Sequence, residues 1–245
     1  HAALIEALAW SAALLLGSGA LAWIGGAIAR RSPARDGALM PPIALFATVA
    51  AGTIFLLLVT GGLVTGLEAG LAVPDWPNSF GHNMLLYPVS QMKGGVYYEH
   101  AHRLFGMLVG LNAFTLAALC WRHEPRRWVR WMALAVLGMV CVQGLLGGLR
   151  VTGRLTLDQD PSLLKPSTAI AIVHGIFGQI VFATVAVIAA VTSRAWLGAT
   201  APITGAAAPG TRLMAMLAPL VLLCQLFLGA AYRHLQVPPV EAGKA

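Results

Sequence analysis

GALMPPIALFATVAAGTIFLLLVTGGLVTGL, residues 37–67, contains no charged side chain. A helix that crosses a bilayer needs about 20 such residues, because it rises about 1.5 Å per residue through a hydrocarbon core about 30 Å thick. Five more stretches of the chain have the same property: 7–29, 104–121, 131–149, 166–193 and 213–232. We therefore predict an all-α integral membrane protein with six transmembrane helices.

The composition supports this class and excludes others. Only 10% of the residues are charged and 58% are hydrophobic, whereas a soluble domain carries about 25% charged residues. A net charge of +7 would by itself suggest a nucleic-acid partner. With a mean hydropathy of +0.76, however, the chain has too little polar surface for a soluble nucleic-acid-binding domain, so we expect a lipid bilayer around it and no nucleic acid.

Basic side chains are concentrated in alternate connections between the predicted helices. The connections after the first, third and fifth helices carry nine Arg against Asp36 and Glu124, and the remaining segments carry seven basic and seven acidic residues. Cytoplasmic loops collect Lys and Arg. We therefore expect these three connections in the cytoplasm and both termini on the outer side, in a bacterial inner (plasma) membrane. The longest connection, 68–99, then lies outside, and its length predicts a folded cap over the helix ends.

Ionisable residues at two places approach the predicted spans. Glu99, His102 and Arg103 stand at the outer start of 104–121, and His174 lies inside 166–193. Such residues are costly in lipid and mark candidate functional sites. Glu99 and His102 are three residues apart, so they share one face of a helix.

His102 and His174 are predicted at similar depths on different helices. Their distances from the outer helix ends differ by less than one or two helical turns. Two imidazoles arranged in this way are what axial ligation of a heme iron requires. The alternative for His174 is a neutral side chain that is hydrogen-bonded to a neighbouring helix. His82 and His123 fall in loops, where we expect ordinary solvated histidines.

Three arginines are predicted at the outer helix ends: Arg103, Arg150 and Arg233. The guanidinium group suits bidentate binding of a carboxylate, so these side chains could reach the propionates of a heme. Interaction with phospholipid headgroups explains them equally well.

These motifs together resemble those of the heme A synthases. The resemblance rests on GGLVTGLEAGLAVPDWP at 61–77, on the Glu99-x-x-His102-Arg103 motif followed by LFGMLVGL, on VQGLLGGLRVTG at 142–153 and on IVHG at 172–175. It extends more loosely to QLFLGAAYRHL at 225–235.

The resemblance implies an oxidoreductase that converts the C8 methyl of heme O to the formyl of heme A for terminal oxidase biogenesis. The substrate heme would sit among the helices within 37–193, with His102 and His174 as iron ligands. Glu99 would be the catalytic acid, which positions or relays a proton or stabilises developing positive charge. Heme O and the heme O synthase that supplies it would be the partners, together with an unidentified electron-transfer partner.

The chain departs from the family pattern in its extent. Relatives have two four-helix halves, the second of which binds a heme b cofactor. Here 1–36 holds an extra helix and a basic loop, 37–193 forms the four-helix heme-binding unit with its outer loop 68–99, and 194–245 holds a linker and the first helix of an incomplete second repeat. A weak repeat of Gln-x-x-Leu-Gly-small, at 143–148 and 225–230, agrees with this division.

Two explanations of the short second half remain open at this stage. Homo-oligomerisation could restore a two-heme arrangement, or the chain could be a partial product. Some family members also carry a Cys pair in the first outer loop, whereas this chain has Ser79 there, so a Cys-mediated step is not expected.

Three functions are compatible with these observations. The first is the heme A synthase-like enzyme. The second is a b-type heme-binding or electron-transfer protein that keeps the His pair and does not oxidise the methyl group. The third, a transporter or structural membrane subunit, leaves Glu99, His102 and His174 without a role.

Overall fold

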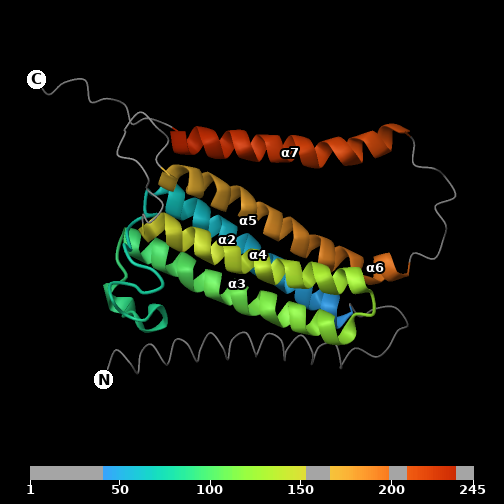
Figure 1. Cartoon of the computed structure of the whole chain (residues 1–245), viewed down its shortest axis with the longest axis horizontal. Helices are drawn as coiled ribbons and strands as arrows, with labels where there is room; N and C mark the ends of the chain where they lie inside the picture. Colours follow the sequence, from blue (N-terminus) through green and yellow to red (C-terminus); the bar gives the residue numbers. More distant parts are fainter. Residues whose placement is uncertain (1–40, 153–165, 199–208, 236–245) are drawn as a thin grey trace, which may run out of the picture.

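The chain folds into long, nearly parallel helices (Figure 1). The computed structural model describes residues 41–152, 166–198 and 209–235. Its helices are α2 (Pro42–Gly66), α3 (Gly95–His123), α4 (Arg127–Thr152), α5 (Pro166–Val191), the single turn α6 (Arg194–Leu197) and α7 (Pro209–Leu235). Two 3₁₀ turns, η1 (Met84–Leu86) and η2 (Val89–Gln91), lie between α2 and α3.

Five of these helices are long and apolar enough to cross a membrane: α2, α3, α4, α5 and α7. The described residues contain no β-strand. The prediction of an all-α membrane protein is therefore confirmed, with five of its six helices. The sixth predicted helix, 7–29, and the basic loop after it lie outside the described residues.

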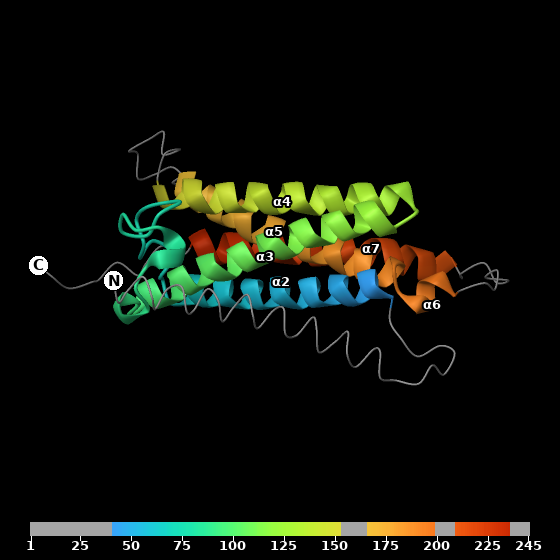
Figure 2. The same cartoon turned by 90° about the horizontal axis from the view of Figure 1, so that it is seen from below.

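Helices α2 to α5 form a four-helix ring. Each packs against two neighbours, in the order α2, α3, α4, α5 and back to α2. Figure 2 shows α2 and α4 on opposite sides of the ring, with α3 and α5 between them. As a result α3 and α5 are diagonal partners, and each of them carries one of the two candidate histidines.

The centre of the ring is packed with aliphatic side chains. Leu116 of α3, Val129 and Val136 of α4 and Ile188 of α5 are fully buried. Alanines fill the closest approaches between helices, as Ala47 does on α2. Lipid is as apolar as these side chains, so close van der Waals packing rather than the hydrophobic effect holds such helices together.

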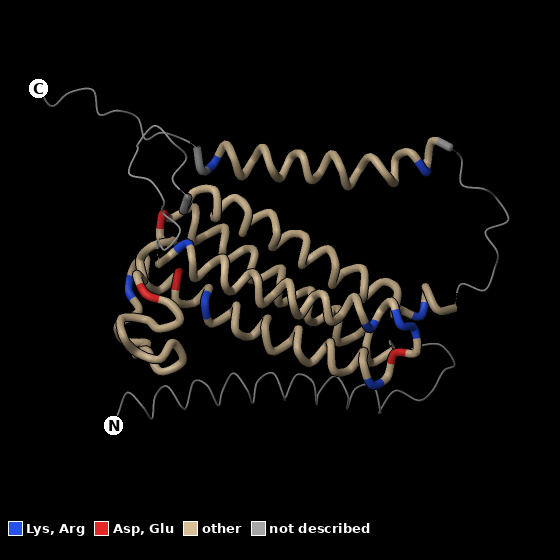
Figure 3. The backbone as a smooth tube through the Cα atoms, in the orientation of Figure 1, with Lys and Arg blue, Asp and Glu red and all other residues tan. Residues whose placement is uncertain are grey.

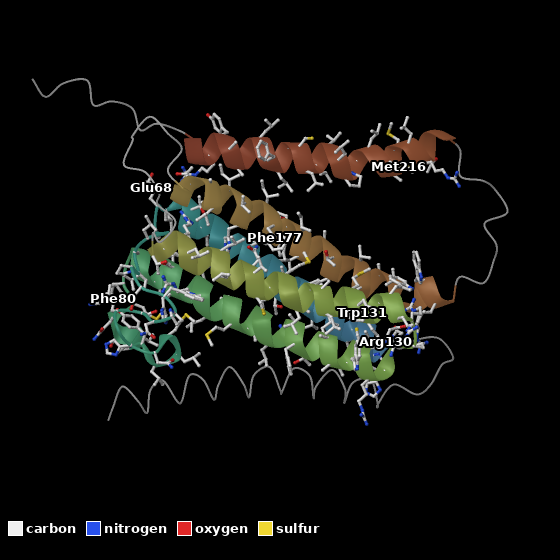
Figure 4. All side chains as sticks on the ribbon, viewed as in Figure 1. Glu68, Phe80, Arg130, Trp131, Phe177 and Met216 are labelled. Carbon is white, nitrogen blue, oxygen red and sulfur yellow. The ribbon has the colours of Figure 1, made fainter. Side chains whose placement is uncertain are left out.

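Helix α7 lies outside the ring and packs mainly against α5 (Figure 1). Its side chains from Gly210 to Gly229 are all exposed, and Met216 illustrates this in Figure 4. At its end, however, Nη2 of Arg233 donates to the carbonyl oxygen of Thr65 on α2, at 2.7 Å. This hydrogen bond joins the end of α7 to the ring.

The two ends of the ring differ in chemistry. The segment 67–94, which we call the cap segment, covers the end where α3 and α5 begin, and we call this the capped end. At the other end the turn between α3 and α4 is rich in Arg, as Figure 3 shows. The connection between α2 and α3 and the connection between α3 and α4 thus lie at opposite ends of the ring, as the alternation of basic residues predicts. Which end faces the cytoplasm and which the outer side stays a prediction.

An ion pair between the buried Glu124 and the partly buried Arg126 stabilises the turn at the basic end. Arg126 donates from Nε to Oε1 of Glu124 at 2.7 Å and from Nη1 to the carbonyl oxygen of Val191 at 2.9 Å. The hydrogen bonds from the Arg126 side chain hold the pKa of the Glu124 carboxyl below its ordinary value, although burial acts to raise that pKa. The turn therefore fastens the end of α5 to the start of α4.

Helix α3 begins earlier than the charge-free stretch 104–121 predicts. It starts at Gly95, so Glu99, His102 and Arg103 lie within the helix, and the connection before it is correspondingly shorter than 68–99. The physical reason is that Glu99 and Arg103 form an i, i+4 ion pair of 2.7 Å. Such a pair favours the helix rather than ending it.

Leu116 offers a test of the packing. Because its side chain is fully buried in the ring, we expect Leu116→Ala to lower the free energy of unfolding by about 2–5 kcal/mol, measured as a lower Tm in detergent. Leu111→Ala on the same helix is the matched control, since that side chain is 47% exposed. Equal losses in the two variants would contradict the described core.

Candidate functional site

Arg103 fastens the cap segment to the start of α3. Its Nη1 donates to the carbonyl oxygens of Asp75 at 2.7 Å and Asn78 at 3.1 Å, and its Nη2 donates to the carbonyl oxygen of Val73 at 2.7 Å. Nη2 also donates to Oε1 of Glu99, at 2.7 Å. A single guanidinium group therefore satisfies three backbone carbonyls of the cap segment.

Glu99 holds the same segment from the opposite direction. Its Oε2 accepts from the backbone N–H of Val73 at 2.8 Å, while Oε1 accepts from Arg103. Glu99 is only 4% exposed. Together Glu99 and Arg103 pin Val73 through both its N–H and its C=O.

His100 is a buried residue whose role the sequence reasoning missed. Its Nδ1 lies 3.1 Å from Oγ of Ser79, and its ring packs on Tyr87 with centroids 5.1 Å apart. Ser79 is itself fully buried. A histidine two residues from another on a helix points to a different side, and this one supports the cap segment.

A tight turn shapes the tip of the cap segment. The carboxylate of Asp75 accepts from the backbone N–H of Phe80 at 2.7 Å and of Gly81 at 2.8 Å. Burial acts to raise the pKa of Asp75, but these backbone hydrogen bonds outweigh it and the pKa is lowered. The indole of Trp76 lies directly against Gly148 of α4, and any Cβ at position 148 would collide with this indole. Figure 4 shows Phe80 at this end of the molecule.

His102 faces α2. Its Nδ1 lies 3.2 Å from Oγ1 of Thr60, and the same hydroxyl lies 2.9 Å from the carbonyl oxygen of Leu57, to which it can donate. With the hydroxyl hydrogen on that carbonyl, Oγ1 accepts from Nδ1–H of His102. This arrangement suits a metal ligand, because it leaves the lone pair of Nε2 free.

His174 faces α4 in a similar setting. Its Cε1 lies 3.5 Å from where a Cβ on Gly147 would stand, as Cε1 of His102 lies 3.0 Å from the corresponding point on Gly61. Each imidazole thus lies against a glycine of the preceding helix in the ring. Gln143 donates from Nε2 to the backbone carbonyl oxygen of His174 at 2.9 Å.

The two histidines lie at the same level of the ring. Cδ2 of Leu58 is 3.2 Å from where a Cβ on Gly178 would stand, which sets the register of α2 against α5. Toward the capped end, Gly61 beside His102 is three residues beyond Leu58, and His174 is four residues beyond Gly178. At about 1.5 Å per residue, both rings lie about 5 Å above this contact.

The donor set suits an iron ion that brings its own equatorial ligands. The described residues contain no group of three or more His, Cys, Asp or Glu that could hold a metal. Two neutral imidazoles on diagonal helices supply only axial ligands, as a heme iron requires. Nδ1 of His174 is buried without a hydrogen-bond partner in the described part of the chain, and each imidazole lies against a glycine, where a larger side chain would crowd it. The residues therefore fit a heme.

Two of the three predicted arginines meet at one cavity of about 230 Å³ at the capped end. Arg150 and Arg233 line it together with Glu68, Gly70 and residues of α2 and the cap segment. Nη2 of Arg150 lies 2.9 Å from where a Cβ on Gly70 would stand, so this glycine makes room for the guanidinium group. Arg103 is not among the lining residues, and a propionate role for it stays a prediction.

Comparison with known proteins gives the family. The family described as cytochrome oxidase assembly protein matches residues 44–238, which is most of the chain and includes both histidines. This chain belongs to that family. The resemblance to the heme A synthases is thereby confirmed.

Curated relatives that match this chain include heme A synthases from mammals and from bacteria. Heme A synthase COX15 of Homo sapiens is 31% identical over 140 residues, which cover 46% of this chain and 33% of the human protein. The heme A synthase of Caulobacter vibrioides is 26% identical over 140 residues, covering 47% of this chain and 41% of its own length. That of Azorhizobium caulinodans is 32% identical over 145 residues, covering 54% of this chain and 40% of its own length.

The chain spans about two fifths or less of the length of these relatives. No solved structure matches this chain. The described residues comprise the four-helix ring and one further long helix, α7.

The Arg103 contacts generate a testable prediction. Arg103→Gln removes charged donors to three cap carbonyls, each hydrogen bond of this kind being worth about 1.5–3 kcal/mol. We expect chymotryptic cleavage at Phe80 to become about tenfold faster or more. Lys93→Gln changes an exposed charge in the same segment and should leave the cleavage rate unchanged. A variant at Arg103 that is as resistant as the unmodified protein would contradict the clamp.

Proposed function

We propose that this chain is a heme A synthase-like membrane oxidoreductase, which oxidises the C8 methyl of heme O to the formyl of heme A for terminal oxidase biogenesis. One observation supports this above the others: His102 and His174, on diagonal helices of the ring, lie at one level, each against a glycine of the preceding helix. Family membership supports the same reaction class, because the curated relatives are heme A synthases.

His102 and His174 would hold the iron of the substrate heme from its two faces. The contact of Nδ1 of His102 with Thr60 favours the tautomer with a free Nε2 lone pair, which is the form that a metal ligand needs. Two such ligands on α3 and α5 would hold the substrate in one orientation and so would keep its C8 methyl at a constant place relative to the helices.

Glu99 is the proposed catalytic acid. It lies one turn before His102 on α3 and is shielded from solvent, at the capped end of the proposed substrate site. A carboxylate there can position or relay a proton, or stabilise positive charge that develops at the methyl carbon. Conversion of the methyl to the alcohol takes up one water and releases two electrons and two protons, and conversion of the alcohol to the formyl releases two more of each. The electrons would leave to a separate acceptor.

Arg150 and Arg233 are proposed to bind the heme propionates. They share one cavity at the capped end, and a heme held by His102 and His174 would direct its carboxylates toward that end. Bidentate hydrogen bonds from guanidinium groups match carboxylate geometry. Orientation of the propionates toward the outer side of an inner (plasma) membrane is part of the same proposal.

The partners follow from the proposed chemistry. Heme O would come from a heme O synthase, and a heme b bound by a further part of a longer protein, or by a second copy of this chain, would accept electrons. Heme-to-protein stoichiometry measured together with the oligomeric mass tests this arrangement.

A second candidate is a b-type heme-binding or electron-transfer protein without methyl oxidation. The observation that favours it is that both carboxylate oxygens of Glu99 are engaged, by the backbone N–H of Val73 and by Arg103, so that this residue can serve the cap segment alone. Pigment extraction separates the two functions. If protein purified from cells supplied with heme O never yields heme A or the alcohol intermediate, the oxidoreductase proposal fails for this chain.

Replacing either histidine tests heme ligation directly. We expect His102→Ala and His174→Ala each to abolish or strongly weaken the heme absorbance of the purified protein, because one axial ligand is lost. His82→Ala and His123→Ala, in exposed positions, should keep the full spectrum. An unchanged spectrum in both of the first two variants would rule out ligation by this pair.

Glu99→Gln tests the catalytic carboxylate. Gln keeps an oxygen that can accept from Val73, so we expect heme to remain bound while turnover falls by about 100-fold or more, measured as heme A formed per bound heme. Glu124→Gln is the matched control, since Glu124 is also a buried carboxylate paired with an Arg but lies at the other end. Full activity in the Glu99 variant would assign this residue a structural role only.

A further inference from the structure

The side chain of Gln143 on α4 contacts the backbone of α5 beside Gly178, where α5 has no side chain. Its Nε2 donates to the carbonyl oxygen of His174 at 2.9 Å and lies 2.9 Å from where a Cβ on Gly178 would stand. Any larger residue at 178 would meet both this amide and Leu58. The absence of a side chain at Gly178 is therefore what admits the amide of Gln143 next to His174.

Two polar atoms at this place are left without a partner. Oε1 of Gln143 and Nδ1 of His174 are both buried, and neither has a hydrogen-bond partner among the described residues. One is an acceptor, and the other becomes a donor when it carries the ring proton. Buried polar groups in folded proteins are nearly always paired, so this pair of orphan atoms on adjoining side chains calls for an explanation.

The other histidine shows what the missing contact does. Oγ1 of Thr60 on α2 lies 3.2 Å from Nδ1 of His102 and can accept its proton, which would leave Nε2 of His102 free. A histidine that binds a metal generally donates its second ring N–H to an oxygen, which fixes the tautomer and the ring orientation and makes the ligand a stronger electron donor. For His174 the candidate oxygen on the preceding helix of the ring is the unpaired Oε1 of Gln143, one helical turn before Gly147.

We propose that Gln143 is the positioning residue of His174. Nε2 of Gln143 holds the backbone carbonyl of His174, and Oε1 accepts the Nδ1–H of His174 directly or through one buried water. Nε2 of His174 is then turned toward the heme iron with its lone pair free. This assignment rests on the proposed function, because it gives Gln143 a role only if His174 binds a heme.

Two substitutions of Gln143 separate this role from a packing role. Gln143→Leu removes both hydrogen bonds, and Gln143→Glu keeps the shape while making the acceptor a carboxylate. The full chain, purified in detergent, is titrated with hemin, and the reduction midpoint potential of the bound heme is measured. Asn112→Leu is the matched control, because Asn112 is a partly buried amide that links α3 to Thr53 of α2, at 3.0 Å and away from His174.

We expect opposite shifts in potential from the two variants. Gln143→Leu should weaken hemin binding by about 10- to 100-fold and raise the midpoint potential, because a less electron-rich imidazole stabilises the ferric state less. Gln143→Glu should keep hemin bound and lower the potential, because a carboxylate acceptor makes the imidazole a stronger donor. Asn112→Leu should leave both quantities unchanged.

The results that overturn the inference are distinct from those that overturn the proposed function. If the unmodified chain binds no hemin, the proposed function fails and the role of Gln143 fails with it. If the unmodified chain binds hemin and both Gln143 variants match Asn112→Leu, only the positioning role fails. Shifts in the same direction for Leu and Glu would likewise reduce Gln143 to a packing residue. Should Gln143→Leu not fold, the near-isosteric Gln143→Glu decides the question alone.

Discussion

The contact of Leu58 with Gly178 sets the register of α2 against α5, and both candidate ligands depend on it. His102 takes its height in the ring from its contacts on α2, whereas His174 takes its height from its place on α5. A slide of one helix by a single turn would move the two imidazoles about 5 Å apart in depth, too far for one planar group to lie between them. Because packing between membrane helices relies on close approach of small residues, a glycine at this contact holds the register through shape alone.

Charge is distributed in the molecule according to its cost in lipid. The polar side chains within the ring are neutral ones, His102, His174, Gln143, Thr60 and Asn112, and each lies beside another helix of the ring. Full charges are confined to the ends, where Glu99 with Arg103 and Glu124 with Arg126 form ion pairs. An unpaired carboxylate at either end would be costly to bury. Each ion pair also makes hydrogen bonds to the backbone of the connection beside it.

Much of the fold could be predicted from the sequence because the bilayer imposes a simple rule on each span. Charge-free stretches located the five long helices. The alternation of basic residues indicated which helix ends lie at the same end of the molecule. The start of α3 could not be found in this way, because the Glu99–Arg103 pair allows charged residues inside the helix. Their positions along the predicted helices pointed to His102 and His174 as candidate ligands, and this stays a prediction. Thr60, Gln143 and Ser79 were not found, since their roles arise from contacts between segments distant in the chain.

Under the proposed function, this distribution also determines how an amphiphilic heme enters the ring. Neutral imidazoles can hold the iron at depth without bringing a charge into the membrane, whereas propionates need cationic partners near water. Arg150 and Arg233 line one cavity at the capped end, whereas at the other end Arg126 is engaged by Glu124 and by the carbonyl oxygen of Val191. Arg233 belongs to α7, which otherwise packs on the outside of the ring. Under the proposed function, the hydrogen bond from Arg233 to Thr65 would make α7 part of the wall around the propionates, so that the helix beyond the ring would take part in substrate binding.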